Sequence, residues 1–93
     1  MTMARPPVVD REGWIDAARN HRDAGARLVS LWGGERAGRR SMFAAYATAE
    51  GLRIVELPLG ADSYPDLSGL FPAADRMQRA ARDLLGVAAE GAA

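Results

Sequence analysis

The chain has 93 residues, 48% of them hydrophobic and 26% charged, and its twelve basic residues, all arginine, are balanced by twelve acidic ones. This length predicts one small globular domain, and the zero net charge gives no reason to expect binding to nucleic acid or to an anionic membrane. The absence of cysteine excludes disulfides, iron–sulfur ligation and thiol chemistry within the sequence. No apolar run approaches the ~18 residues of a membrane span, and the start lacks the apolar core of a signal peptide, so a cytoplasmic location is expected.

The first predicted element is a helix that begins near residue 10. Pro6 and Pro7 indicate an extended lead-in over residues 1–9. Asp10 is a suitable N-cap for the helix, Trp14 stands on its apolar side at helical spacing, and Gly25 is a natural residue to end it.

Three strand-like runs follow, over residues 26–32, 42–48 and 52–57. Residues 33–40 are polar and glycine-rich and are predicted to form a loop between the first two strands, and Glu50-Gly51 is predicted to form a short turn between the second and third. Short connections between successive strands favour an antiparallel meander.

The last third of the chain changes to a helical pattern. Residues 64–70 are predicted to form a short helical turn, and Pro72 is well placed at the start of a longer helix that Gly86 ends. Its apolar stripe is predicted to pack on the sheet and consists of Met77, Ala80, Ala81 and Leu84. The fold class is therefore α+β, with a mainly antiparallel sheet of three or more strands and a helix at each end of the chain packed on it.

The sequence contains few groups that carry chemistry. His21 is the only histidine and has no partners at metal-ligand or acid–base spacing, which favours a structural role. The glycine-rich segment 33–40 precedes a strand and lacks the Lys-Ser/Thr pair of a phosphate loop. We therefore expect no catalytic residue, no metal and no cofactor in this chain. A free-standing small-molecule enzyme would need a nucleophile or an acid–base pair in a pocket, and none is visible at fixed spacing.

Arginines recur every three residues along the predicted last helix, at Arg76, Arg79 and Arg82. Asp75 and Asp83 lie one turn before and one turn after Arg79, and could neutralise part of this ridge. The ridge is either a solvated face or a contact surface whose guanidinium groups bind carboxylates of a partner.

One segment resembles a known family. The run Leu70-Phe71-Pro72-Ala73-Ala74-Asp75, followed by Arg79, Asp83-Leu84 and Gly86-Val87, is similar to the C-terminal motif of the 30-kDa-subunit family of respiratory complex I. The family pattern has a tryptophan where this chain has Arg76, a phenylalanine where it has Leu85, and glutamates at Gln78 and Ala80. These departures favour the divergent form that occurs as the N-terminal domain of formate hydrogenlyase-type nickel–iron hydrogenase large subunits.

The resemblance implies a family domain over residues 10–87, with residues 88–93 as a tail or the start of a linker to a further domain. It implies a non-catalytic assembly domain without a redox centre, in a hydrogenase or an NADH–quinone oxidoreductase. Its partners would be the large catalytic subunit and the iron–sulfur subunits, and its location the cytoplasmic side of the membrane, through the parent complex and without insertion. A free-standing adaptor or regulatory module that kept only the fold is the alternative. The expected interface residues are Phe71, Pro72, Asp75, Arg76, Arg79, Arg82 and Asp83.

Overall fold

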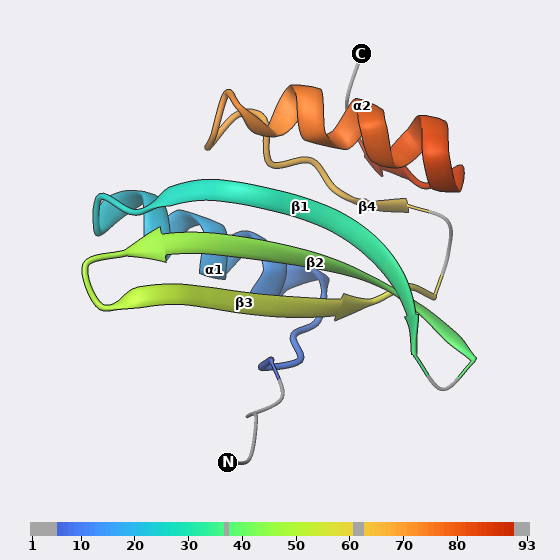
Figure 1. The fold of residues 1–93 in the computed structure, drawn as a ribbon, viewed down its shortest axis with the longest axis horizontal. Helices are drawn as coiled ribbons and strands as arrows, with labels where there is room; N and C mark the ends of the chain where they lie inside the picture. Colours follow the sequence, from blue (N-terminus) through green and yellow to red (C-terminus); the bar gives the residue numbers. More distant parts are fainter. Residues whose placement is uncertain (1–5, 37, 61–62, 91–93) are drawn as a thin grey trace.

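A computed structural model describes residues 6–36, 38–60 and 63–90. The elements follow one another as α1 (Arg11–Asp23), β1 (Arg27–Arg36), β2 (Arg39–Thr48), β3 (Gly51–Pro58), β4 (Ser63–Pro65), α2 (Ala74–Leu85) and β5 (Ala88–Glu90). The strands form a three-stranded antiparallel sheet in the order β1-β2-β3 and a separate parallel pair, β4-β5 (Figure 1). The predicted α+β class, the meander and a helix at each end of the chain are confirmed.

Helix α1 begins and ends where its capping residues predict. The Asp10 carboxylate accepts a hydrogen bond from the Gly13 N–H at 2.7 Å, which satisfies one of the free amides of the first turn. After the helix, Gly25 adopts a φ of 82°, a left-handed conformation that glycine enters without steric cost. The helix buries Trp14 and Ala18 against the sheet.

The glycine-rich segment 33–40 does not form the predicted loop. Strand β1 continues through Gly33 and Gly34 to residue 36, and β2 already begins at Arg39, so the two strands pair almost to the tip of the hairpin. The part of the predicted loop at residue 37 lies outside the described residues. A Cβ at position 33 would meet Leu85 Cδ1 of α2, and this flexible side chain would have to move to make room for it. Gly33 therefore lies where β1 packs closely against the end of α2, whereas a Cβ at Gly34 would meet Phe43 of β2.

The segment after β3 also departs from prediction. Tyr64 and Pro65, expected to begin a helical turn, instead belong to β4, which pairs in parallel with β5 in the register Ser63 to Ala88 and Pro65 to Glu90. Within the predicted segment 64–70, only residues 68–70 form a turn. Residues 88–90, expected as the start of a tail, thus belong to the fold; residues 91–93 lie outside the described part.

The predicted apolar stripe of the last helix is only half right: Ala81 is buried and Met77 packs against the core, but Ala80 and Leu84 point outward. Ala74, Gln78 and Ala81 are the buried residues of α2, whereas Leu84 is 82% exposed and Ala80 is exposed. The prediction assumed that every inward-facing position is apolar. It therefore left Gln78 out of the buried face and assigned that face to neighbouring positions of the helix. The face that packs on the sheet repeats at residues 74, 78, 81 and 85, and it shares only Ala81 with the predicted stripe.

Both helices pack on one face of the sheet, where the core lies. His21 of α1 and Phe71, which precedes α2, both pack on the Tyr46 ring, and Leu85 packs at Gly33 on the same side of the sheet. In Figure 1, α1 passes behind β2 and β3, while α2 runs along β1. No helix in the described part of the chain is long and apolar enough to cross a membrane.

Candidate functional site

The outward face of α2 carries the three arginines that the sequence singled out. Arg76, Arg79 and Arg82 are all exposed. Arg79 forms an ion pair with Asp75 at 3.2 Å, and the two side chains are 74% and 52% exposed, so water screens the pair strongly. Asp83 is also exposed, one turn beyond Arg79. The arginines are therefore displayed to solvent and only partly neutralised by their own helix.

The two apolar residues of the predicted interface differ in their surroundings. Phe71 is 8% exposed and packs on Tyr46 with 5.6 Å between ring centroids, so it belongs mainly to the core. Pro72 is exposed and lies between two shallow hollows of about 410 and 450 Å³, one shared with residues 26–29 and one with Asp75–Met77. The five charged residues of the predicted interface and Pro72 thus remain accessible from outside.

A buried side chain that sequence reasoning discounted holds this helix in place. Gln78 is 4% exposed; its Oε1 accepts from the Leu67 N–H at 2.9 Å and its Nε2 donates to Asp66 Oδ1 at 2.6 Å. Asp66 also accepts from the Ser68 N–H and hydroxyl, both at 2.9 Å. Gln78 therefore connects α2 to the segment before it. The sequence did not indicate this role, because polar residues are seldom buried and are not expected in the core.

The same hydrogen bonds act on the charge of Asp66. Partial burial acts to raise the pKa of this carboxyl, but the bonds that it accepts from Gln78 and Ser68 outweigh that effect and lower the pKa. Asp66 therefore stays ionised, as a hydrogen-bond acceptor that closes the turn. Asp66 thus helps to hold α2, whose outward face carries the three arginines.

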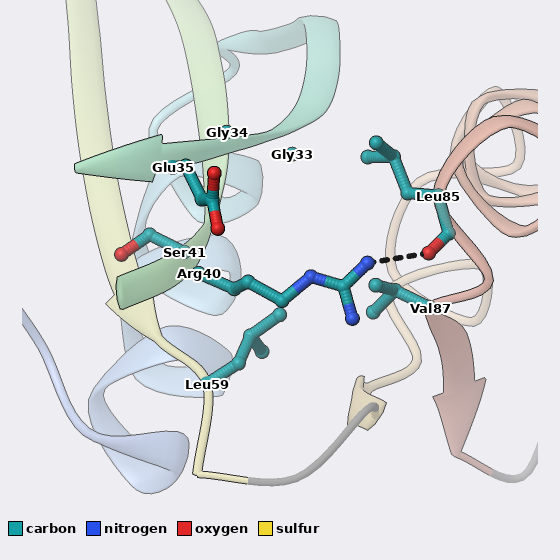
Figure 2. A pocket seen from close by; sticks show the side chains of 8 residues that line it. All are labelled: Gly33, Gly34, Glu35, Arg40, Ser41, Leu59, Leu85 and Val87. Carbon is teal, nitrogen blue, oxygen red and sulfur yellow. Dashed lines mark hydrogen bonds between the residues drawn. The ribbon is translucent and has the colours of Figure 1, made fainter. Parts of the chain in front are cut away.

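A pocket of about 380 Å³ lies at the C-terminal end of α2, beside the β1–β2 hairpin (Figure 2). Arg40 reaches across it and donates to the Leu85 carbonyl at 2.7 Å, which satisfies a free carbonyl at the end of the helix. Ser41 also lines the pocket, but it is 2% exposed and donates to Glu56 Oε2 at 2.8 Å beneath the surface. The pocket thus joins helix to hairpin, and the Ser41 hydroxyl is engaged in a structural hydrogen bond.

The remaining groups able to carry chemistry are engaged in packing. His21 Nδ1 lies 2.7 Å from the Ala17 carbonyl oxygen, and its ring stacks on Tyr46 at a centroid distance of 4.2 Å. Burial raises the pKa of Tyr46 and of Tyr64 to about 12, with Asp66 adding to the effect at Tyr64. Among the residues that the structure describes, no three His, Asp or Glu side chains gather as a metal site.

Comparisons with known proteins agree with the fold and with the motif of residues 70–87. A solved structure of the trypsin-resistant fragment 1–134 of Nqo5 matches with a TM-score of 0.79 over 92% of this chain and 78% of that one, at 17% sequence identity, which shows a shared fold. No curated protein matches the chain. The model of the family described as respiratory-chain NADH dehydrogenase, 30 Kd subunit, matches residues 7–93. With all but six residues inside this match, the chain belongs to the 30 Kd subunit family of the respiratory-chain NADH dehydrogenase.

Proposed function

We propose that this chain is a non-catalytic assembly domain of a multisubunit oxidoreductase, and that the outward face of α2 binds a neighbouring subunit. Family membership over residues 7–93 is the observation that carries the proposal. The exposed ridge of Arg76, Arg79 and Arg82 supports it, because guanidinium groups can bind carboxylates in a bidentate manner.

The positions at which this chain departs from the family motif favour a divergent partner. Gln78 replaces one glutamate on the inside of α2, where its bonds to residues 66 and 67 serve the fold. Arg76 and Ala80 replace a tryptophan and a glutamate on the exposed side. The surface has thereby become more basic, which supports a parent complex of the hydrogenase type with a more acidic contact at this place.

The partners in this proposal are the large catalytic subunit or domain and the iron–sulfur subunits, which would hold all redox groups. The chain itself would bind no cofactor and would reach the inner face of the membrane only through the complex. The alternative is a free-standing adaptor with the same fold. The loss of the motif glutamate at Ala80, on the exposed side of α2, is the observation that favours it, because a charged group for a partner is missing there.

Affinity purification from the native host distinguishes an assembly domain from a free-standing adaptor. A tagged full chain purified under mild conditions should bring down subunits of a hydrogenase or an NADH–quinone oxidoreductase, identified by mass spectrometry. Replacing Arg76, Arg79 and Arg82 with alanine should weaken the assembly by ~2 kcal/mol or more if the ridge is the interface. The fold should hold, because an exposed pair such as Arg79–Asp75 contributes at most ~1 kcal/mol.

A matched variant controls for the loss of three positive charges. Arg19, Arg22 and Arg53 have side chains that are 54%, 44% and 55% exposed, away from α2. Their replacement with alanine should leave the co-purified subunits unchanged. Equal recovery with both triple variants would remove the interface role from the ridge, and recovery of partners unrelated to oxidoreductases would favour the adaptor.

A further inference from the structure

The sheet has a second face that no described element covers. Because both helices pack on the face that carries Tyr46, no described helix or strand lies over the opposite face (Figure 1), although Ser41, Ala45 and Glu56 on that face are buried. Residues that pair directly across antiparallel strands point to the same side. The register therefore places on this open face the residues Arg27, Ser30, Trp32, Arg39, Ser41, Phe43, Ala45, Ala47, Leu52, Ile54 and Glu56.

The centre of the open face is apolar and preorganised. The Trp32 and Phe43 rings, on adjacent strands, stack with 5.4 Å between centroids and 12° between planes. Trp32 is 37% exposed and Ile54 is partly exposed, and Leu52, which is 62% exposed, extends the apolar surface toward the Arg27 end. Two stacked rings held on the middle of a sheet lose little conformational entropy on binding, which is typical of the aromatic anchors at protein interfaces.

The charge of the open face has one sign. Arg39 and Arg27 are both exposed and lie at opposite ends, because Arg27 pairs with Ala47, eight positions along β2 from Arg39. That spacing corresponds to roughly 26 Å. Glu56 is the one carboxylate that the described register places on this face, and it is 5% exposed and hydrogen-bonded to Ser41. The accessible charge is therefore positive.

We propose that the open face is a second docking surface, and that it binds an amphipathic segment of another protein that has apolar side chains at its centre and carboxylates near both ends. The proposal extends the proposed function, on which it rests for a neighbouring subunit. A second copy of this chain is a poor occupant, because two such faces would bring arginines against arginines at both ends without an accessible carboxylate between them. The α2 ridge and the open face would then bind two different segments, on different sides of the domain.

Site-specific photo-crosslinking in the native host tests this proposal. A benzoylphenylalanine placed at Leu52 samples the open face, and the same residue at Asn20, exposed on α1, is the control. We expect a product at position 52 and not at position 20, joined to a peptide of another protein in which apolar residues are flanked by more Asp and Glu than Lys and Arg. A product with a second copy, a product with a basic peptide, or equal yields at the two positions would overturn the proposal.

Charge reversal provides the matched variants. Arg27→Glu with Arg39→Glu should lower the yield at position 52 by about tenfold, because both ends then repel carboxylates. Arg19→Glu with Arg22→Glu makes the same change in charge on α1 and should leave the yield unchanged. Equal yields from the two double variants would overturn the proposal.

The two proposals fail in different ways. If oxidoreductase subunits co-purify but the crosslink does not form, the open-face proposal is wrong and the assembly role stands. If the crosslink forms with an acidic amphipathic segment but no oxidoreductase subunit is recovered, the docking surface stands and the assembly role is wrong.

Discussion

Single residues determine where the arginine-bearing face of α2 points, and Gln78 is the main one. Its carboxamide satisfies the buried Leu67 N–H and binds Asp66, so it both orients the helix and fixes the turn before it. A sequence pattern treats such a residue as outward-facing, since polar side chains are buried only when their hydrogen bonds are met inside. The atoms that Gln78 binds are on the backbone of residue 67 and on Asp66, and the sequence pattern around Gln78 does not indicate them.

Gln78→Ala should therefore destabilise the protein more than its size suggests. The change leaves the buried Leu67 N–H without an acceptor, for which we expect a cost of about 2 kcal/mol in the free energy of unfolding. Urea denaturation followed by circular dichroism measures it. Arg79→Ala on the exposed side of the same helix is the control and should cost less than ~1 kcal/mol. Equal midpoints for the two variants would show that the Gln78 hydrogen bonds do not stabilise the fold.

At the scale of elements, α2 can be tested for the face that it buries. Ala81 is 6% exposed and Leu84 is 82% exposed, although only three positions separate them. Ala81→Asp places a charge in the seam with the sheet and should cost several kcal/mol, enough to unfold a domain of this size. Leu84→Asp should change stability by less than ~0.5 kcal/mol, as is usual for surface substitutions. Thermal melts of both variants test which face is buried. A larger loss of melting temperature from Leu84→Asp than from Ala81→Asp would show that the assigned face is wrong.

The elements themselves could be predicted wherever a local rule governs them. The capping carboxylate of Asp10, the left-handed Gly25 and Gly86, and the alternating run before Pro58 all give boundaries within a few residues. The failures share a different origin. Gly33 lies in a strand that packs against α2, a helix more than forty residues away, and β4 exists because of its pairing with β5. Contacts between distant segments override local preference in both cases.

The candidate site could be predicted only in part from the sequence, for the same reason. The exposure of Arg76, Arg79 and Arg82 follows from helical spacing together with the family motif, and the structure places them outward. The open face of the sheet could not be predicted, because it depends on both helices packing on the same side. The alternation of β2 indicates two faces, but which face remains uncovered is a property of the tertiary fold.

At the scale of the whole molecule, the two tyrosines couple the fold to alkaline pH. Burial raises the pKa of both Tyr46 and Tyr64 from 10.0 to about 12. A raised pKa means that the folded state favours the protonated phenol, so the stabilisation is fully present below pH 10 and is lost as the pH rises toward 12. We expect the free energy of unfolding to fall across this window, as measured by urea denaturation at a series of pH values.

The chain contains just two tyrosines, so phenolate absorbance near 295 nm reports on these two groups alone. In the folded protein the absorbance should rise near pH 12, together with unfolding. Tyr46→Phe removes one of the two groups and should reduce the pH dependence of stability between pH 10 and 12. A phenolate transition near pH 10 while circular dichroism still shows the folded state would contradict the assigned burial.

The contact between the start of the described chain and β3 bears on aggregation. The Pro7 carbonyl accepts from the Glu56 N–H at 2.9 Å, and the Val9 N–H donates to the Glu56 carbonyl at 2.8 Å, in a parallel bridge centred on Val8. An outer strand with free amides is a template on which further chains can add. Here the template is occupied by a segment that begins with Pro6 and Pro7, which have no amide hydrogen to offer a next strand. The bridge thus occupies the edge of β3 at Glu56, and the segment that makes it has two prolines, which cannot donate a backbone hydrogen bond to a further strand there.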